Sequence, residues 1–285
     1  MDLQTLQYFR AVAAEGSLSK AAQKLHYAQS NLSTKIMQLE QEMGNPLFYR
    51  NNHGVTLTPK GELLLKYAVN LIDLAQETMV AMKDDETAKC TLMIGSMEST
   101  VVTYLAGFLS RFHQENPNVA VRVETGTTDA MVQKVLDHKL NGAFVAGPVR
   151  HPALVTRPVR TEKLCLIASR DLVSRGSVQD MLAQPLLVFP HGCSYRRALE
   201  QWTKDEGMAV SQIYEFNTLN AIFASAVAGL GVALFPEDCI RQYSQKDALT
   251  VLNAPEKYAL VPTVFVYRKD SYLSGALRGF INSIS

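Results

Sequence analysis

The feature that most constrains this chain is a stretch at residues 59–83 that reads as one long helix. Thr58 and Pro59 form a strong helix start, with a capping hydroxyl before a proline at the first helical position. Apolar or small residues recur at intervals of three and four along it: Leu64, Tyr67, Leu71, Leu74, Thr78 and Ala81. Such a helix is about 37 Å long. Its heptad-like seam needs a partner, and a second copy of the chain is the simplest one.

Residues 1–58 predict a small helical module that ends in a β-hairpin. Three helices are expected near residues 3–15, 18–25 and 29–43, with Gly16 and Gly44 ending the first and the third. Ser17 can cap the second helix with its hydroxyl. Extended residues 46–48, the polar turn 50–54 and residues 55–57 follow in a strand–turn–strand pattern that is typical of a wing.

The second and third helices, over about residues 18–37, have the pattern of a helix-turn-helix. Ala21 and Ala22 are small enough for a close helix crossing. In this motif the N-terminal residues of the following helix face base edges in the major groove. The side chains suited to such contacts are Gln29, Ser30, Asn31, Ser33, Thr34 and Lys35. A helical hairpin whose polar face meets only solvent fits the same pattern, so the residues alone leave both interpretations open.

Composition limits how such a module can bind nucleic acid. The whole chain has 28 Lys and Arg against 27 Asp and Glu, a formal net charge of +1. This balance excludes a protein that binds nucleic acid through a general basic coat. We therefore expect a local patch with specific geometry, in which amides and hydroxyls meet several of the phosphates.

Compartment and metal content are also constrained by the sequence. We expect a cytoplasmic protein without a membrane span, because no basic cluster and apolar stretch resembling a signal peptide opens the sequence. The four cysteines, Cys90, Cys165, Cys193 and Cys239, are widely spaced. They form no zinc-type pattern, so free thiols and no metal site are expected, with a redox role for Cys193 as the alternative.

From residue 90 onward short apolar strands alternate with helices. This alternation predicts mainly parallel sheets flanked by helices, in two α/β lobes. Strands are expected at 91–95, 119–124, 143–146, 154–158, 163–168, 186–189, 213–215, 232–235, 249–252 and 263–267. Helices are expected near 100–115, 130–138, 177–182, 195–206, 219–228 and 272–283.

Three hydroxyl-rich segments lie where a strand or turn gives way to a helix in this region. Free N–H groups and helix dipoles at such points attract anions, and ligands bind at strand ends in α/β sheets. The candidate effector-binding residues are Ser96, Ser99, Thr100, Thr127, Thr128, Ser194, Tyr195 and Arg196. Arg196 can fork onto a carboxylate, which favours a small organic anion as ligand. Glu98 complicates the prediction of an anion, because a carboxylate favours an amine. Ser and Thr at these positions also fit ordinary helix capping without any ligand contact, so that alternative remains open.

Taken together, these segments resemble the LysR-type transcriptional regulators. At the N-terminal end the resemblance rests on SLSKAAQKL at 17–25, QSNLS at 29–33, PLFYR at 46–50 and LTPKG at 57–61. It continues through DHKLNG at 137–142, GCSYR at 192–196 and GLGVALFP at 229–236, so it covers essentially the whole chain. It implies an α/β protein overall: a winged helix-turn-helix, a long linker helix and a two-lobed effector domain like type 2 periplasmic binding proteins. It also implies double-stranded DNA as partner, homodimers that pair into tetramers, a small-molecule inducer and possible contact with RNA polymerase.

The resemblance places Gln29 and Ser33 at the family's major-groove positions and Arg50 beside the wing, where a cation meets phosphate. Asn52 and His53 belong to the same wing. This chain departs from the family at three points: Ala28 replaces a usual Ser or Thr, Thr34 replaces a frequent Arg, and His53 stands where Arg is common. The preferred bases therefore cannot be copied from relatives.

The expected organisation is a DNA-binding domain at 1–58, a linker and dimerisation segment at 59–89, and an effector domain at 90–285. Lobe I is expected at about 90–160 and 267–285 and lobe II at about 161–266, with hinges near 160–163 and 262–266. Neither catalytic residues nor a cofactor are expected, because P-loop, GxGxxG, HExxH and GxSxG motifs are missing. A solute-binding protein or an enzyme of the same two-lobed architecture, without a DNA role, is the alternative.

Overall fold

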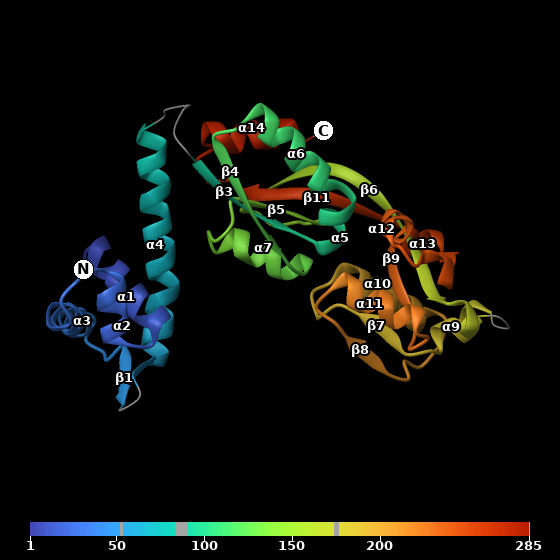
Figure 1. Ribbon diagram of the computed structural model, residues 1–285, viewed down its shortest axis with the longest axis horizontal. Coiled ribbons are helices and arrows are strands. Elements are labelled where there is room, and N and C mark those ends of the chain that lie inside the picture. The colour runs from blue at the N-terminus through green and yellow to red at the C-terminus, as the bar shows by residue number, and fades with distance from the viewer. Residues whose placement is uncertain (52–53, 84–89, 174–176, 285) are drawn as a thin grey trace. The chain divides into compact units, whose positions relative to one another are not determined.

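The computed structural model describes residues 1–51, 54–83, 90–173 and 177–284. The chain forms two compact units, Met1–Asp84 and Asp85–Ser285 (Figure 1). Within the described residues, no helix is both long enough and apolar enough to cross a bilayer.

The first unit contains four helices and a hairpin, as the sequence predicts. The elements are α1 (Leu3–Glu15), α2 (Leu18–Lys24), α3 (Gln29–Met43), β1 (Phe48–Asn51), β2 (Gly54–Leu57) and α4 (Pro59–Lys83). Ser17 caps α2 by accepting the Lys20 N–H at 3.4 Å. Gly16 and Gly44 end α1 and α3 in left-handed conformations.

The wing is attached to the end of α1. Strands β1 and β2 pair antiparallel, with Phe48 opposite Leu57. The Val55 N–H donates to the carbonyl of Gly16 at 2.9 Å. A Cβ on Gly54 would lie 2.3 Å from that same oxygen, so only glycine lets the hairpin approach α1 this closely. The described part of the wing is therefore closely joined to the rest of the first unit.

Helix α4 has one buried side and one exposed apolar side. Ala68 and Ile72 are buried in a core that it shares with Phe9 of α1 and Ile36 of α3. Its exposed large apolar side chains are Leu63, Tyr67, Leu71, Leu74, Met79 and Met82. Isolated exposed apolar residues are normal, but a row along one helix marks an interaction surface.

The second unit is a two-lobed α/β structure. Its first lobe is built from β3 (Cys90–Ser96), α5 (Glu98–Thr100), η1 (Val101–Leu105), α6 (Ala106–Glu115), β4 (Val119–Thr125), α7 (Thr128–Leu136), β5 (Gly142–Ala146), β11 (Leu260–Arg268) and α14 (Gly275–Ser283). Its second lobe contains α8 (Arg170–Val173), α9 (Val178–Leu182), β7 (Leu186–Val188), α10 (Ser194–Asp205), β8 (Ile213–Glu215), α11 (Leu219–Val227), β9 (Ala233–Pro236), α12 (Glu237–Gln242), η2 (Lys246–Ala248), β10 (Leu249–Asn253) and α13 (Glu256–Ala259). Strand β6 (Leu154–Ser169) belongs to both.

The expectation of mainly parallel sheets is wrong for much of this unit. The order of the main sheet is β10-β6-β11-β5-β3-β4, with β9 also paired to β6. Strand β3 pairs parallel with β4 and β5, and β7 pairs parallel with β8. Strands β9, β10 and β11 instead pair antiparallel with β6. Strands β6 and β11 connect the lobes and run in opposite directions, one out and one back, while β9 and β10 lie within the second lobe and also pair antiparallel with β6.

Strand β6 also replaces two predicted strands, 154–158 and 163–168. Its first half pairs with β11 and its second half with β9 and β10, so one strand passes from the first lobe into the second (Figure 1). Strand β11 is the return path, and it pairs with β5 from Thr263 onward. The return to lobe I therefore lies earlier than the predicted residue 267.

The helices of lobe I cover both faces of its sheet. Phe144 of β5 and Phe265 of β11 face α6 and α14, where Phe108 and Phe280 complete an aromatic cluster. The alternate residues Val145 and Val264 face α7 on the other side. Lobe II has its own core around Trp202 of α10 and Phe223 of α11. The cleft lies between the two lobes, where Met97 and Ala146 of lobe I pack against the core of lobe II.

Helix N-termini are positioned along the edge of that cleft. The helix predicted from residue 100 begins two residues earlier, at Glu98, and continues through the π-helical turn η1 into α6. Thr127 caps α7 by accepting the Ala130 N–H at 3.4 Å. Thr218 caps α11 in the same way with the Ala221 N–H at 3.3 Å.

Candidate DNA-reading helix and effector cleft

Helix α3 presents a polar face to solvent. Leu32, Ile36 and Leu39 are buried on its inner side. The predicted base-contacting residues lie elsewhere on the helix: Gln29, Ser30, Asn31 and Thr34 are exposed, and Ser33 and Lys35 are half-buried. The predicted set is therefore accessible to a ligand, and most of it sits in the first two turns.

The start of α3 carries no side-chain cap, as expected from Ala28. The first N–H groups of a helix lack partners within the helix and, together with the helix dipole, favour a phosphate. Thr34 donates its hydroxyl to the Ser30 carbonyl at 3.0 Å. This leaves the oxygen lone pairs of Thr34 available to a base or a backbone donor.

Arg50 is held in place by a carboxylate. Its guanidinium donates to Glu40 Oε2 at 2.8 Å, and Glu40 Oε1 accepts the Leu47 N–H at 2.9 Å and the Phe48 N–H at 3.2 Å. The side chain of Arg50 remains 41% exposed, so it can still meet an anion while Glu40 fixes its direction. The other two predicted wing residues, Asn52 and His53, lie outside the described residues.

Sequence reasoning missed Met37, which is 42% exposed on α3. It follows Ser33 by four residues and so shares its side of the helix. An exposed apolar side chain among polar ones can contact a thymine methyl group. The sequence could have indicated this residue, because the apolar spacing of positions 32, 36 and 39 places position 37 outside the buried face of the helix.

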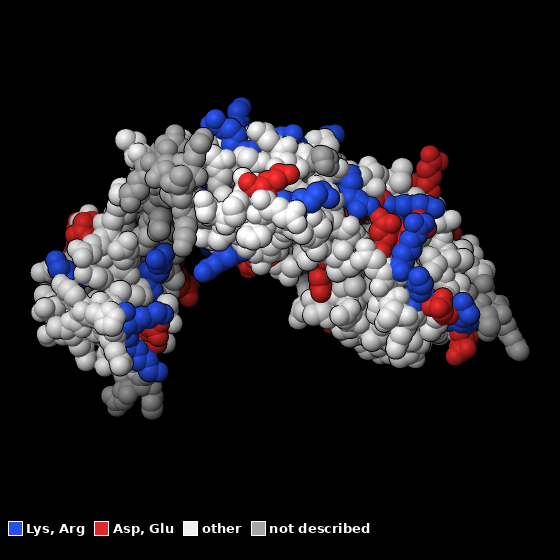
Figure 2. All heavy atoms as spheres, turned by 45° about the horizontal axis from the view of Figure 1, so that its top comes forward, with Lys and Arg blue, Asp and Glu red and all other residues white. Residues whose placement is uncertain are grey.

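Charged side chains on the face drawn in Figure 2 are scattered and of both signs. Much of that face carries neither sign, which agrees with the balanced composition. Attraction to DNA must therefore depend on the placement of individual groups.

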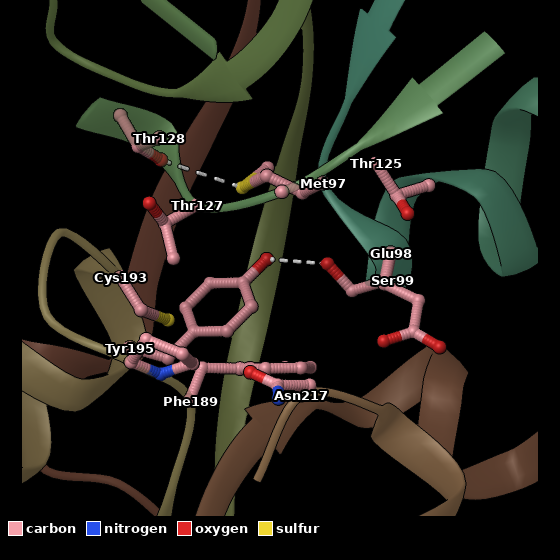
Figure 3. A pocket seen from close by; sticks show the side chains of 12 residues that line it. Met97, Glu98, Ser99, Thr125, Thr127, Thr128, Phe189, Cys193, Tyr195 and Asn217 are labelled. Carbon is pink, nitrogen blue, oxygen red and sulfur yellow. Dashed lines mark hydrogen bonds between the residues drawn. The ribbon is translucent and has the colours of Figure 1, made fainter. Parts of the chain in front are cut away.

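The second unit contains a cavity of about 220 Å³ between the lobes. Its lining comes from the ends of strands and the starts of helices in both lobes: Met97, Glu98, Ser99, Thr125, Gly126, Thr127, Thr128, Phe189, Pro190, Cys193, Tyr195 and Asn217. Figure 3 shows Tyr195 in the middle of this group with its hydroxyl toward Ser99. Four of the eight predicted effector-binding residues, Ser99, Thr127, Thr128 and Tyr195, are among the lining.

The other four predicted residues lie near the cavity without lining it. Ser96 is buried and donates its hydroxyl to the Met97 carbonyl at 2.9 Å. Thr100 is fully buried on α5. Ser194 lines a neighbouring cavity and donates to Thr128 Oγ1 at 3.4 Å.

Arg196 lies outside the cavity lining and is paired with groups of the protein itself, so its predicted contact with the ligand stays a prediction. Its side chain is only 5% exposed, and its guanidinium donates to Glu200 at 2.7 Å and to Glu215 at 2.6 Å. It also donates to the Phe189 carbonyl at 3.1 Å. Arg196 does fork onto carboxylates, but they belong to the protein itself, and Glu215 on β8 could not be placed beside it from sequence.

A buried hydrogen-bond chain connects the cavity to the strand that joins the lobes. Tyr195 donates its hydroxyl to Glu162 Oε2 on β6 at 2.7 Å. Ser99 Oγ lies 3.1 Å from the same hydroxyl and therefore donates to it. Burial raises the pKa of Glu162, although the Tyr195 hydrogen bond lowers it in part. Burial likewise raises the pKa of Tyr195, further increased by the Glu162 charge.

Direct contacts cross the cleft on both sides of the cavity. Glu98 Oε2 accepts the N–H of Leu219, at the start of α11, at 2.8 Å. On the other side Arg197 of α10 donates to Asp129 of α7 at 2.8 Å. The Asp129 N–H also donates to the Gly192 carbonyl at 3.3 Å. The lobes therefore touch each other in this structure.

The charge of the cavity differs from the sequence expectation. Among its described lining residues there is no Lys, Arg or His, and Glu98 is the single carboxylate. Burial raises the pKa of the Cys193 thiol, which disfavours the nucleophilic thiolate form. In the part of the chain that the structure describes, no group of His, Cys, Asp and Glu is arranged to hold a metal ion.

Family models match nearly the whole chain. The "Bacterial regulatory helix-turn-helix protein, lysR family" model matches residues 3–62, and the "LysR substrate binding domain" model matches residues 85–285. The chain belongs to the LysR family. It is thus a DNA-binding transcriptional regulator with an effector-binding domain, and not an enzyme.

Named relatives and solved structures agree with this assignment. The regulator CzcR of Bacillus thuringiensis subsp. konkukian is 40% identical over 284 residues, covering 100% of this chain and 97% of CzcR. GltR of Bacillus subtilis is 39% identical, covering 99% of this chain and 95% of GltR. Full-length CbnR complexed with its target DNA superposes with a TM-score of 0.74 at 22% identity, covering 100% and 99% of the two chains. At that identity the superposition shows a common fold.

Proposed function

We propose that this LysR-type regulator binds double-stranded DNA as a homodimer, with α3 of each subunit in a major groove. The two grooves would lie about 34 Å apart, one helical turn of DNA. Gln29, Ser30, Asn31, Ser33, Thr34 and Lys35 are the proposed contacts on α3. The observation that carries this proposal is the polar, solvent-facing side of α3 at an uncapped helix start. Arg50, Asn52 and His53 of the wing are proposed to meet phosphates beside the groove.

The dimer is proposed to form through α4. Leu63, Tyr67, Leu71 and Leu74 are exposed apolar residues on one helix, and a second copy would bury them in a coiled-coil-like seam. Two dimers are proposed to join into a tetramer. The regulator is expected to act in the cytoplasm, where the chromosome lies, and to influence access of RNA polymerase.

The effector is proposed to be a small organic anion that binds in the cavity between the lobes. Thr127 and Thr128 can donate their hydroxyls to a carboxylate, whereas Ser99 and Tyr195 line the cavity with hydroxyls that already donate to Tyr195 and to Glu162. The starts of α7 and α10 add dipoles that favour negative charge. Ser96, Thr100 and Ser194 act behind these residues as supports.

Effector binding is proposed to act by closing the lobes about β6 and β11. The pairing of these strands is irregular between Thr263 and Val264, inside one of the two predicted hinge segments. A bulge bends a strand and is a natural place for such a motion. The effector can shift the equilibrium only as far as its affinity differs between the open and closed forms.

Substitution of Gln29 tests the DNA-reading part of this proposal. Gln29→Ala removes a bidentate group worth about 1–3 kcal/mol of base discrimination, so specific affinity should fall by roughly 5- to 150-fold. Affinity for random duplex should be unchanged. The matched control is Gln38→Ala, which removes an exposed glutamine nine residues later on the opposite side of α3. Fluorescence anisotropy measures the affinity of each variant for an operator duplex and for a random duplex. Equal losses of affinity on the two duplexes would exclude Gln29 as a residue that contacts bases specifically.

A further inference from the structure

The cavity presents a ligand with one fixed negative charge and, among its described lining residues, no positive one. Glu98 is half-buried, and it lies beside Ser99 on the turn that opens α5. An anion in this small cavity next to a carboxylate would meet repulsion that weak dielectric screening makes costly. The hydroxyls and helix starts can receive a carboxylate, but they do not cancel Glu98.

We propose that the effector carries an ammonium group as well as its carboxylate, and that Glu98 is the residue that recognises the ammonium. The ligand class is a small aminocarboxylate. This inference rests on the proposed function: it keeps the carboxylate and adds the group that Glu98 requires.

The geometry separates two ends of the cavity. Glu98 extends from the first lobe toward the segment of the second lobe that carries Asn217 and Leu219. The hydroxyls of Thr127 and Thr128 come from the start of α7, a different element. A ligand that places its ammonium at Glu98 and its carboxylate at α7 satisfies both ends with opposite charges.

The other lining residues and the cavity volume define the surroundings of the rest of the ligand. Met97, Phe189 and the ring of Tyr195 are apolar surfaces, and aromatic faces attract a nearby ammonium. The volume of about 220 Å³ lies below the range of drug-sized pockets, which is about 300–1,000 Å³. A molecule the size of an amino acid suits it.

Glu98 also connects the ligand to the closure of the lobes. Its Oε2 accepts the Leu219 N–H, so the same carboxylate that meets the ammonium touches the second lobe. An ammonium next to Glu98 would occupy the cleft where the lobes meet. Recognition of the cationic group therefore acts on the interface that the effector has to control.

The test uses isothermal titration of the full-length chain with matched compounds on one carbon skeleton. Each set contains a carboxylic acid, its amino derivative and the amine without the carboxylate. The variants are Glu98→Gln, which keeps an oxygen for the Leu219 N–H but removes the charge, and Glu256→Gln, a control at an exposed position outside the cavity. Fluorescence of Trp202, the single tryptophan, checks that each variant folds.

We expect the natural chain to bind at least one aminocarboxylate at least tenfold more tightly than its acid. Glu98→Gln should remove most of that preference, whereas Glu256→Gln should retain it. Equal or tighter binding of the acid by the natural chain, or an unchanged preference in Glu98→Gln, would overturn the role of Glu98 while leaving the anionic effector in place. Binding of the amine alone, or of no carboxylate of either kind, would overturn both this inference and the proposed organic anion.

Discussion

Removing one hydroxyl from the centre of the cleft should destabilise the effector unit in a pH-dependent way. Tyr195→Phe keeps the ring but deletes the group that donates to Glu162 at 2.7 Å and accepts from Ser99 at 3.1 Å. Glu162 is 2% exposed, and its Oε1 already has no hydrogen-bond partner in the structure. The substitution therefore leaves a buried carboxyl group without its donor.

The size of the effect follows from the protonation state of Glu162. A hydrogen bond to a charged group contributes about 1.5–3 kcal/mol and a neutral one about 0.5–1.5 kcal/mol. The loss should therefore lie between about 0.5 and 3 kcal/mol and should be larger at pH 8 than at pH 5, because the charged fraction of Glu162 rises with pH. The stability loss grows with pH because burial raises the pKa of Glu162 and losing the Tyr195 hydrogen bond raises that pKa further. A raised pKa favours folding at low pH, and that stability is lost as the pH rises through the folded-state value.

The assay is thermal unfolding followed by the fluorescence of Trp202, which is buried in the core of lobe II and so reports on this unit. For a unit of this size each kcal/mol corresponds to about 2–4 °C, so the loss of a charged hydrogen bond of about 1.5–3 kcal/mol would lower the midpoint by roughly 3–12 °C, with the larger shift at pH 8. Tyr214→Phe, on β8 outside the cavity lining, is the matched control. A loss that is the same at pH 5 and pH 8 would refute the reasoning.

Three further substitutions test separate parts of the structure. Leu71→Glu, at a 40% exposed position on α4, should shift the mass measured by light scattering toward the 31.5 kDa of one chain; an unchanged mass would exclude α4 from the interface. Arg196→Ala should lower the free energy of unfolding by about 1–3 kcal/mol, because it removes a buried side chain and its hydrogen bonds while the 33% and 48% exposed Glu200 and Glu215 stay solvated, and should leave effector affinity nearly unchanged. A tenfold loss of affinity in a fully stable variant would return Arg196 to the ligand site. Gly192→Ala, where φ is +91° and a Cβ would lie 2.9 Å from Thr127 Oγ1, should cost about 1–3 kcal/mol in the same unfolding assay; wild-type stability would show that the loop relaxes freely.

The DNA-binding unit was predictable because its determinants are local. The caps at Ser17 and Thr58, the left-handed glycines at 16 and 44, and the spacing of Leu32, Ile36 and Leu39 lie within a few residues of what they control. Each element could be assigned from its own segment. The missing cap at Ala28 was visible for the same reason.

The cleft was less predictable because its decisive contacts join distant segments. Glu98 and Leu219 are 121 residues apart, and Arg196 meets Glu215 across two elements. Sequence indicated that Arg196 seeks carboxylates but not that the protein supplies them. The antiparallel pairing along β6 was missed because alternating strands and helices usually give parallel sheets, and nothing local marks a strand that crosses between lobes.

The central claim, that α3 reads base edges in two major grooves, is tested most directly by base-resolved footprinting of the full-length chain on fragments of its own genome. The account predicts a preferred fragment, with guanine N7 protected in two patches whose centres are about 10 base pairs, or a multiple, apart. Folded protein that binds every genomic fragment and random duplex equally, without major-groove protection, would contradict it.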